Sequence, residues 1–99
     1  MWYILEGQYG TDIDDLRATH RPAHLKRLEA LMAEGRLLVA GPVPNIDAED
    51  PGPAGFSGNL MVAEFTDMDA AQAWLELDPY RTGGVYTGVR VRPFLKVLP

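Results

Sequence analysis

The stretch Asn59-Leu-Met-Val-Ala-Glu-Phe65 decides the fold, because its apolar side chains occur at both odd and even positions. A strand with one solvated face alternates apolar and polar residues, whereas a strand that is buried on both faces does not. We therefore predict a strand here that is covered on both sides. Helices of the same chain supply one cover, and the second face needs another layer.

The residues that follow this strand predict a helix and a final strand. Thr66 or Asp67 can cap a helix whose apolar positions continue as far as Asp78-Pro79. The pair Gly83-Gly84 then marks a turn, and the stretch from Tyr86 to Val97 alternates apolar with basic residues as a strand does. In this interpretation Asp78 closes the helix at its C-terminal end.

The first helix is predicted to fall into two parts. Apolar residues recur at helical spacing over residues 16–32, but Pro22 interrupts this pattern. Proline is tolerated best in the first turn of a helix, so we expect a short lead-in over residues 13–19 and a main helix from about Arg21. Gly35 is a natural residue to end it.

Two more strands and a long loop complete the pattern. Trp2–Leu5 and Arg36–Val43 are apolar runs typical of strands, whereas Pro44–Gly58 is rich in proline, glycine and acidic residues. Loops of this length in compact domains are usually lids or binding loops, and we expect a lid or pocket wall. The order βαββαβ predicts a ferredoxin-like α+β fold, with a four-stranded antiparallel sheet that carries both helices on one face.

Composition narrows the possible partners and places. The 99 residues form one domain, and a hydrophobic fraction of 46% at this size favours a homodimer in which the open sheet faces cover each other. A net charge of -5 argues against nucleic acid as a partner. No apolar run is long enough for a membrane span, and the first residues lack the basic flank of a signal peptide, so we expect a cytoplasmic protein. The absence of cysteine excludes thiol nucleophiles and thiolate metal sites.

One histidine and one carboxylate carry the clearest chemical signal. His24 shares the inward stripe of Leu28 and Leu31, and in the predicted helix pair it lies beside Asp78. A carboxylate that orients an imidazole makes a general acid/base unit. If the main helix starts near Arg21, its dipole disfavours the imidazolium form of His24, and Asp78 faces the opposite dipole end and needs a donor.

Four further residues are candidates for the same site. Arg21 either orients a substrate carboxylate or phenolate or forms a surface ion pair, and Tyr80 either lines the pocket or belongs to the core. Ser57 is a possible hydrogen-bond donor to substrate, although no serine triad supports a nucleophilic role. His20 and His24 have the i, i+4 spacing of zinc helices but lack an evident third ligand, so we predict no metal site.

Several motifs occur together in an order that resembles a known family. They are Arg21-Pro-Ala-His-Leu25, Glu34-Gly-Arg-Leu-Leu38, Ala40-Gly-Pro42, Asp50-Pro-Gly-Pro-Ala-Gly-Phe-Ser-Gly58, Ala70-Ala-Gln-Ala-Trp74, Asp78-Pro-Tyr80 and Gly84-Val-Tyr86. Together they resemble the YciI-like family over nearly the whole chain. The resemblance implies a dimeric α+β barrel of ferredoxin-like subunits, related in fold to muconolactone isomerases, with the family's His/Asp pair on His24 and Asp78. It also implies the kind of chemistry seen in one relative, a dehydrochlorinase of a chlorinated hydroxyhydroquinone.

These observations predict a cofactor-free acid/base enzyme. Its catalytic residues would be His24 and Asp78, and Arg21, Tyr80 and Ser57 would bind a small cyclic or aromatic metabolite. Isomerisation, elimination and hydrolysis are the reactions that such a pair serves. The alternative is a non-catalytic ligand-binding or accessory dimer, because fold alone does not fix function. A ring nitrogen of His24 that faces a cavity would favour catalysis, and a fully bonded ring would favour a structural role.

Overall fold

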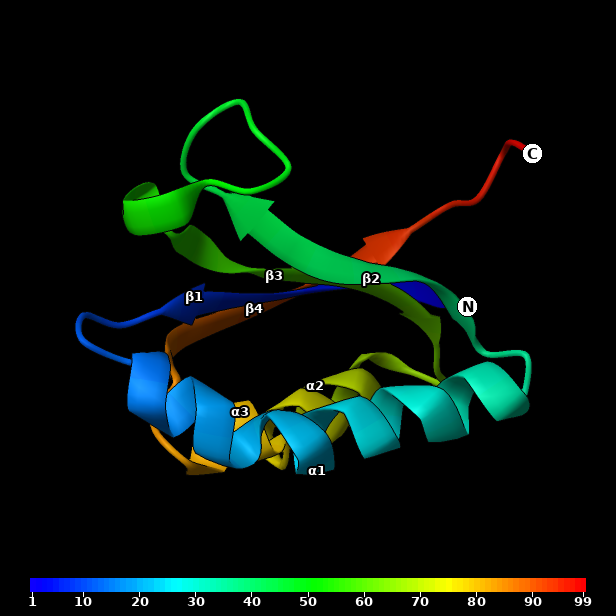
Figure 1. The fold of residues 1–99 in the computed structure, drawn as a ribbon. Helices are drawn as coiled ribbons and strands as arrows, with labels where there is room; N and C mark the ends of the chain where they lie inside the picture. Colours follow the sequence, from blue (N-terminus) through cyan, green and yellow to red (C-terminus); the bar gives the residue numbers. More distant parts are fainter.

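Four strands form one antiparallel sheet, and the α-helices lie against one of its faces (Figure 1). The computed structural model describes residues 1–99. The elements are β1 (Trp2–Tyr9), α1 (Asp14–Ala33), β2 (Leu37–Pro44), the 3-10 turn η1 (Gly52–Ala54), β3 (Phe56–Glu64), α2 (Met68–Glu76), α3 (Pro79–Thr82) and β4 (Tyr86–Phe94). The strand order β2-β3-β1-β4 confirms the predicted ferredoxin-like α+β fold.

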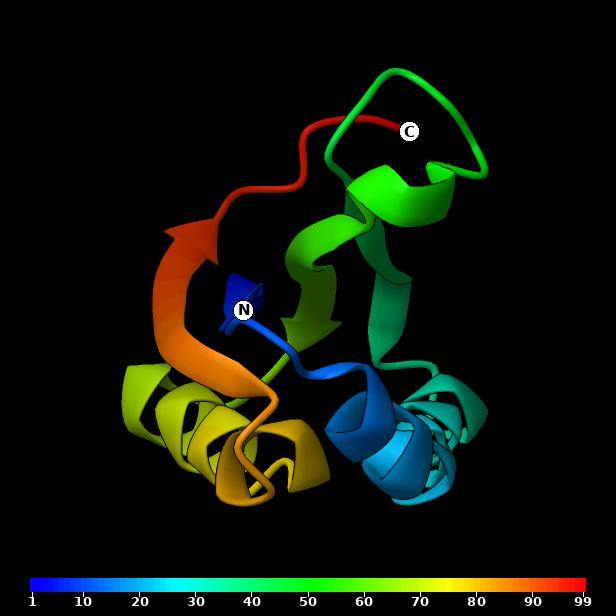
Figure 2. The ribbon, with the colours of Figure 1, turned by 60° about the vertical axis from the view of Figure 1, so that its left-hand side comes forward.

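The predicted two-sided burial of the third strand is confirmed. Met61 and Ala63 of β3 belong to the core between the sheet and the helices, where α1 and α2 contribute Leu28 and Leu75. Val62 points to the other face of the sheet and is also only 6% exposed. On that face a single chain provides no second layer of secondary structure; only the β2–β3 loop and the C-terminal tail extend past it (Figure 2).

The first helix does not break at Pro22. α1 is one continuous helix of 20 residues with Pro22 inside it, so the predicted lead-in and restart near Arg21 are wrong. An interior proline costs roughly 3 kcal/mol, and burial of Leu28 and Leu31 on one helix face offsets this cost. His24 therefore lies in mid-helix, where the terminal dipole has little effect, and the dipole argument for this residue fails.

The second predicted helix ends earlier than expected. α2 stops at Glu76, and Asp78 is the N-cap of the short helix α3, not the C-terminal residue of α2. The residue before a proline avoids the helical conformation, and proline suits the first helical position, so Asp78-Pro79 ends one helix and begins the next. The Asp78 carboxylate thus meets the favourable end of a helix dipole, and our dipole argument for this residue was also wrong.

The last strand and the long loop are shorter than predicted. β4 ends at Phe94, and Val97, which we expected in the strand, is 82% exposed in a C-terminal tail. Between β2 and β3 the loop closes at its base, where the backbone N–H and side-chain amide of Asn45 donate to the carbonyls of Gly55 at 3.0 Å and Ala54 at 2.8 Å. No helix in the structure has the length and apolar character needed to cross a membrane.

Candidate active site

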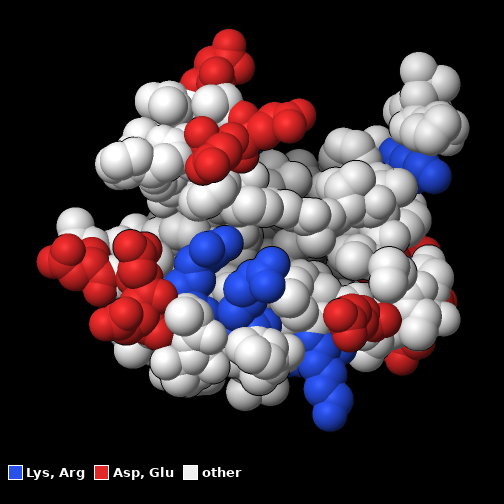
Figure 3. All heavy atoms as spheres, in the orientation of Figure 1, with Lys and Arg blue, Asp and Glu red and all other residues white.

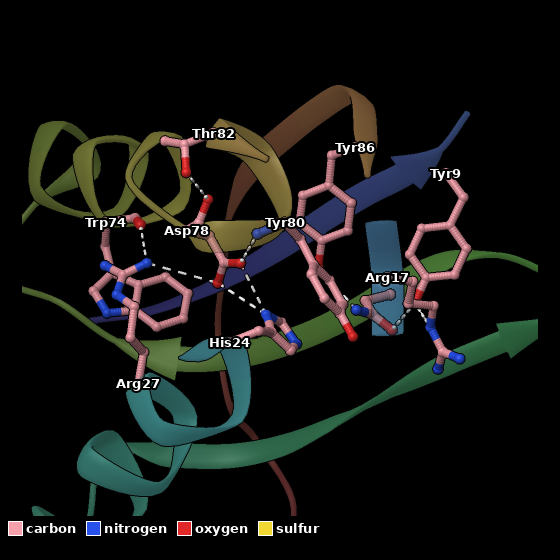
Figure 4. Close-up of polar contacts among 10 residues, drawn as sticks. Tyr9, Arg17, His24, Arg27, Trp74, Asp78, Tyr80, Thr82 and Tyr86 are labelled. Carbon is pink, nitrogen blue, oxygen red and sulfur yellow. Dashed lines mark hydrogen bonds and ion pairs between the residues drawn. The ribbon is translucent and has the colours of Figure 1, made fainter. Parts of the chain in front are cut away.

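His24 and Asp78 are in direct contact, although 54 residues separate them in sequence (Figure 4). The Nδ1 atom of His24 lies 2.9 Å from Oδ1 and 3.1 Å from Oδ2 of Asp78. His24 is 4% exposed and Asp78 is 0% exposed. Because carboxylate oxygens only accept hydrogen bonds, the hydrogen on Nδ1 donates to Asp78, and the lone pair of the neutral ring resides on Nε2.

Asp78 is held by further contacts in addition to that with the imidazole. Its Oδ1 accepts a hydrogen bond of 2.8 Å from the backbone N–H of Tyr80, and Nη1 of Arg27 lies 3.6 Å from its Oδ2. Arg27 is itself fixed, since Nη1 donates to the carbonyl of Trp74 at 2.9 Å and the guanidinium lies 4.3 Å from the centre of the Trp74 ring. These contacts compensate the buried carboxylate and hold it against His24.

The other ring nitrogen of His24 faces a cavity. Nε2 makes no hydrogen bond within the chain and is not sealed from solvent. The cavity has a volume of about 210 Å³ and lies between α1, β2 and β3. Its lining residues are Arg17, Arg21, His24, Leu25, Leu28, Ala40, Gly41, Pro42, Asn59, Met61 and Tyr80. The two ring nitrogens of His24 therefore have different surroundings.

Both positions that the sequence left open for Tyr80 are occupied, because the residue belongs to the core and also lines this cavity. Its ring stacks on the His24 ring with 3.9 Å between centroids and 7° between planes. The hydroxyl makes no hydrogen bond within the chain and is not sealed from solvent. Burial raises the pKa of Tyr80 above its ordinary value, so the group is a neutral hydrogen-bond donor at physiological pH.

A chain of polar side chains that the sequence analysis missed extends from the cavity. The Nε of Arg17 donates to the Tyr9 hydroxyl at 3.1 Å, which donates to Oδ1 of Asn59 at 3.0 Å. The Nδ2 of Asn59 in turn donates to the Tyr86 hydroxyl at 2.9 Å. Two signals were present in the sequence: Arg17 is one helical turn before Arg21, and Asn59 opens an apolar strand.

The remaining predicted site residues are divided by the fold. Arg21 lines the cavity beside His24, whereas Ser57 is exposed, donates to the carbonyl of Val43 at 3.3 Å, and does not line the cavity. The loop between β2 and β3 does not line it either, so within one chain it is not the pocket wall that we expected. No group of three or more His, Cys, Asp or Glu side chains is placed to hold a metal ion.

We expect the buried phenols to make the protein less stable at high pH. Burial raises the pKa of both Tyr80 and Tyr86 above the ordinary value of 10.0. The folded state therefore retains protons that the unfolded state releases, and the free energy of unfolding falls as the pH rises through and above this value. Denaturant titrations between about pH 9 and about pH 11 should show a smaller decrease for Tyr86→Phe than for the wild type. An identical decrease in both proteins would contradict this account.

Comparison with known proteins identifies the family of this chain. The family profile described as the YCII-related domain matches residues 1–95. The chain belongs to this family. It is 52% identical over 97 residues to the protein YciI of Escherichia coli O6:H1 and 45% identical over 97 residues to a protein of Haemophilus influenzae; each match covers 98% of this chain and 99% of the relative.

One solved structure shares the fold of this YCII-related chain. It is the 5-chloro-2-hydroxyhydroquinone dehydrochlorinase (TftG) of Burkholderia phenoliruptrix AC1100, in complex with 2,5-dihydroxybenzoquinone. The TM-score is 0.81, the identity is 21%, and the match covers 96% of this chain and 94% of the dehydrochlorinase. At this identity the likeness concerns the fold.

Proposed function

We propose that this YCII-related chain is an enzyme that moves a proton on a small molecule through Nε2 of His24, with Asp78 as the orienting partner. The proposal rests on the different surroundings of the two imidazole nitrogens. Nδ1 is bound to a buried carboxylate, and Nε2 faces a cavity. A histidine oriented in this way is a general base in its neutral form and a general acid after it takes the proton.

The size and lining of the cavity support a small substrate. Its volume of about 210 Å³ lies below the 300 to 1,000 Å³ or so of pockets for drug-sized ligands, and it suits a molecule with roughly one ring. Leu25, Leu28 and Met61 provide apolar walls for such a ring. We therefore propose a cyclic or aromatic metabolite that undergoes isomerisation or elimination, and the same base can activate water for hydrolysis.

Proton transfer to and from carbon provides the test of this proposal. The protein is incubated in D₂O with a panel of small cyclic enolisable compounds and with 5-chloro-2-hydroxyhydroquinone, the compound named for the structural neighbour. We expect deuterium incorporation, or chloride release from the chlorinated compound, above the rate without protein. Compounds that bind without any reaction would favour the alternative function, a non-catalytic ligand-binding module.

We further propose that two copies of the chain associate through the open face of the sheet. Val62 is buried on that face, and its register neighbours Ile4 and Val39 add apolar surface. Association of two such faces would remove this surface from water, and a stable interface of this kind buries more than about 1,000 Å².

Sedimentation velocity at micromolar concentration should therefore detect a dimer. Leu60→Lys places a charge on the same face of β3 and is expected to shift the protein to monomer, because the ammonium would have to be desolvated in the interface. Met32→Lys changes an exposed residue on α1 and serves as the matched control, which should remain dimeric. A monomeric wild type would contradict the proposed association.

A further inference from the structure

We propose that Arg17 and Arg21 together bind the negatively charged group of a small planar molecule, either a carboxylate or an ionised enol. The inference deepens the proposed function and rests on it for the identification of the cavity as the reaction site. The charge of the ligand, however, is tested by binding alone and does not depend on turnover.

The ion pairs of the chain leave three of its seven arginines without a carboxylate partner. The sequence has 14 acidic and nine basic residues, so a carboxylate partner is easy to find. Four arginines have one within ion-pair distance: Arg27, Arg36, Arg81 and Arg92. Arg17, Arg21 and Arg90 form no ion pair in the chain, although Asp14 and Asp15 begin the helix that carries the first two. Of these three, only Arg17 and Arg21 line the cavity that His24 faces.

The cavity wall has basic but no acidic side chains. None of its lining residues is acidic, while the chain as a whole carries a net charge of -5. Figure 3 shows basic side chains gathered in the hollow between α1 and the sheet, with acidic side chains to either side. Inside this hollow the field of two guanidinium groups favours an anion, and the acidic surroundings disfavour anions elsewhere on this face.

Helical spacing places the two arginines next to the reacting nitrogen. Arg17 and Arg21 are four residues apart and His24 follows three residues later, so all three lie on one face of α1. A ligand whose anionic group contacts both arginines would extend its ring along this face towards Nε2. The apolar walls and the free hydroxyl of Tyr80 would then surround the ring.

The guanidinium group of Arg17 is held in place by neighbouring side chains. Its Nε is occupied by the Tyr9 hydroxyl at 3.1 Å, and its guanidinium carbon lies 5.6 Å from the centre of the Tyr9 ring and 5.4 Å from that of Phe56. The terminal nitrogens make no hydrogen bond within the chain. The fixed guanidinium therefore presents free N–H groups, and planar donors of this kind suit the paired oxygens of a carboxylate or an ionised enol.

The experiment measures the affinity of three probes by isothermal titration calorimetry. Benzoate supplies a carboxylate, cyclohexane-1,3-dione at neutral pH supplies an ionised enol, and benzamide is the neutral isostere of benzoate. We expect at least one of the two anions to bind at least about 10-fold more tightly than benzamide, and the arm that does so identifies the anion type. Equal binding of benzamide and both anions would overturn the inference.

Three variants locate the binding group. Arg17→Gln and Arg21→Gln should each weaken the preferred anion by about 10-fold. Lys26→Gln removes an exposed positive charge on the same helix outside the cavity and should leave the affinity unchanged. Binding is measured without turnover, so a loss of affinity in the arginine variants is distinguishable from a failure of the catalytic role proposed for His24.

The Arg21→Gln variant still tests the proposal if Arg17→Gln disturbs the fold. Arg21 is exposed and makes no hydrogen bond within the chain, so its replacement should leave the fold intact. An unchanged affinity in folded Arg21→Gln, or an equal loss in Lys26→Gln, would overturn the two-arginine site.

Discussion

Replacement of His24 by Gln is expected to lower turnover by about 10³-fold, within the range that general acid/base catalysis contributes. The cause is the loss of the basic nitrogen that faces the cavity, because an amide does not take up a proton at neutral pH. Glutamine is chosen over alanine because its amide N–H can still donate to the buried Asp78 carboxylate, which limits the loss of stability. The rate is measured on whichever compound of the deuterium-exchange panel reacts fastest with the wild type.

The chain offers a matched control for this variant. His20 lies one turn earlier on α1 but does not line the cavity, so His20→Gln should retain the wild-type rate. Circular dichroism and a melting curve establish that both variants are folded. A folded His24→Gln variant with undiminished turnover would rule out the catalytic role of this histidine, whatever the geometry of the pair.

Replacement of Asp78 by Ala is expected to lower the free energy of unfolding by about 3 kcal/mol or more, because it removes one partner of a buried charged cluster. The carboxylate is fully buried, and its loss leaves the Nδ1–H of His24 and the backbone N–H of Tyr80 without acceptors. Arg27 also loses the carboxylate beside it. The midpoint of urea unfolding, measured with an unchanged slope, reports this effect.

A second aspartate provides a control that distinguishes the contribution of the buried contacts to stability from that of helix capping. Asp67 is the N-cap of α2, where its side chain accepts a hydrogen bond of 2.8 Å from the backbone N–H of Ala70, and it is exposed. Asp67→Ala should therefore cost only about 1 kcal/mol. If both aspartate variants lose equal stability, then Asp78 acts as an ordinary helix cap and the buried cluster adds little.

The positions of the strands follow from local pattern, and so does the inward direction of His24. Apolar residues at both parities of β3 required burial on two sides, and Val62 is indeed buried on the face that the helices do not cover. The spacing of His24 from Leu28 and Leu31 placed it on the buried stripe of α1, which is where it lies. These properties have a period set by the backbone geometry of a helix or strand, so the sequence alone determines them.

Only the tertiary structure decided how helix ends and polar groups are used. Local propensity predicted a break in α1 at Pro22, but packing of the buried face of the helix keeps it continuous. Asp78-Pro79 is compatible with a helix stop and with a helix start, and the structure uses it as both. The hydrogen bonds of Tyr9 with Arg17 and with Asn59 join three elements, α1, β1 and β3, and the bond to Asn59 spans 50 residues of sequence. Such contacts depend on how the elements pack in space, which no local spacing encodes, and this is why the cavity and its two unpaired arginines appear only in the folded chain.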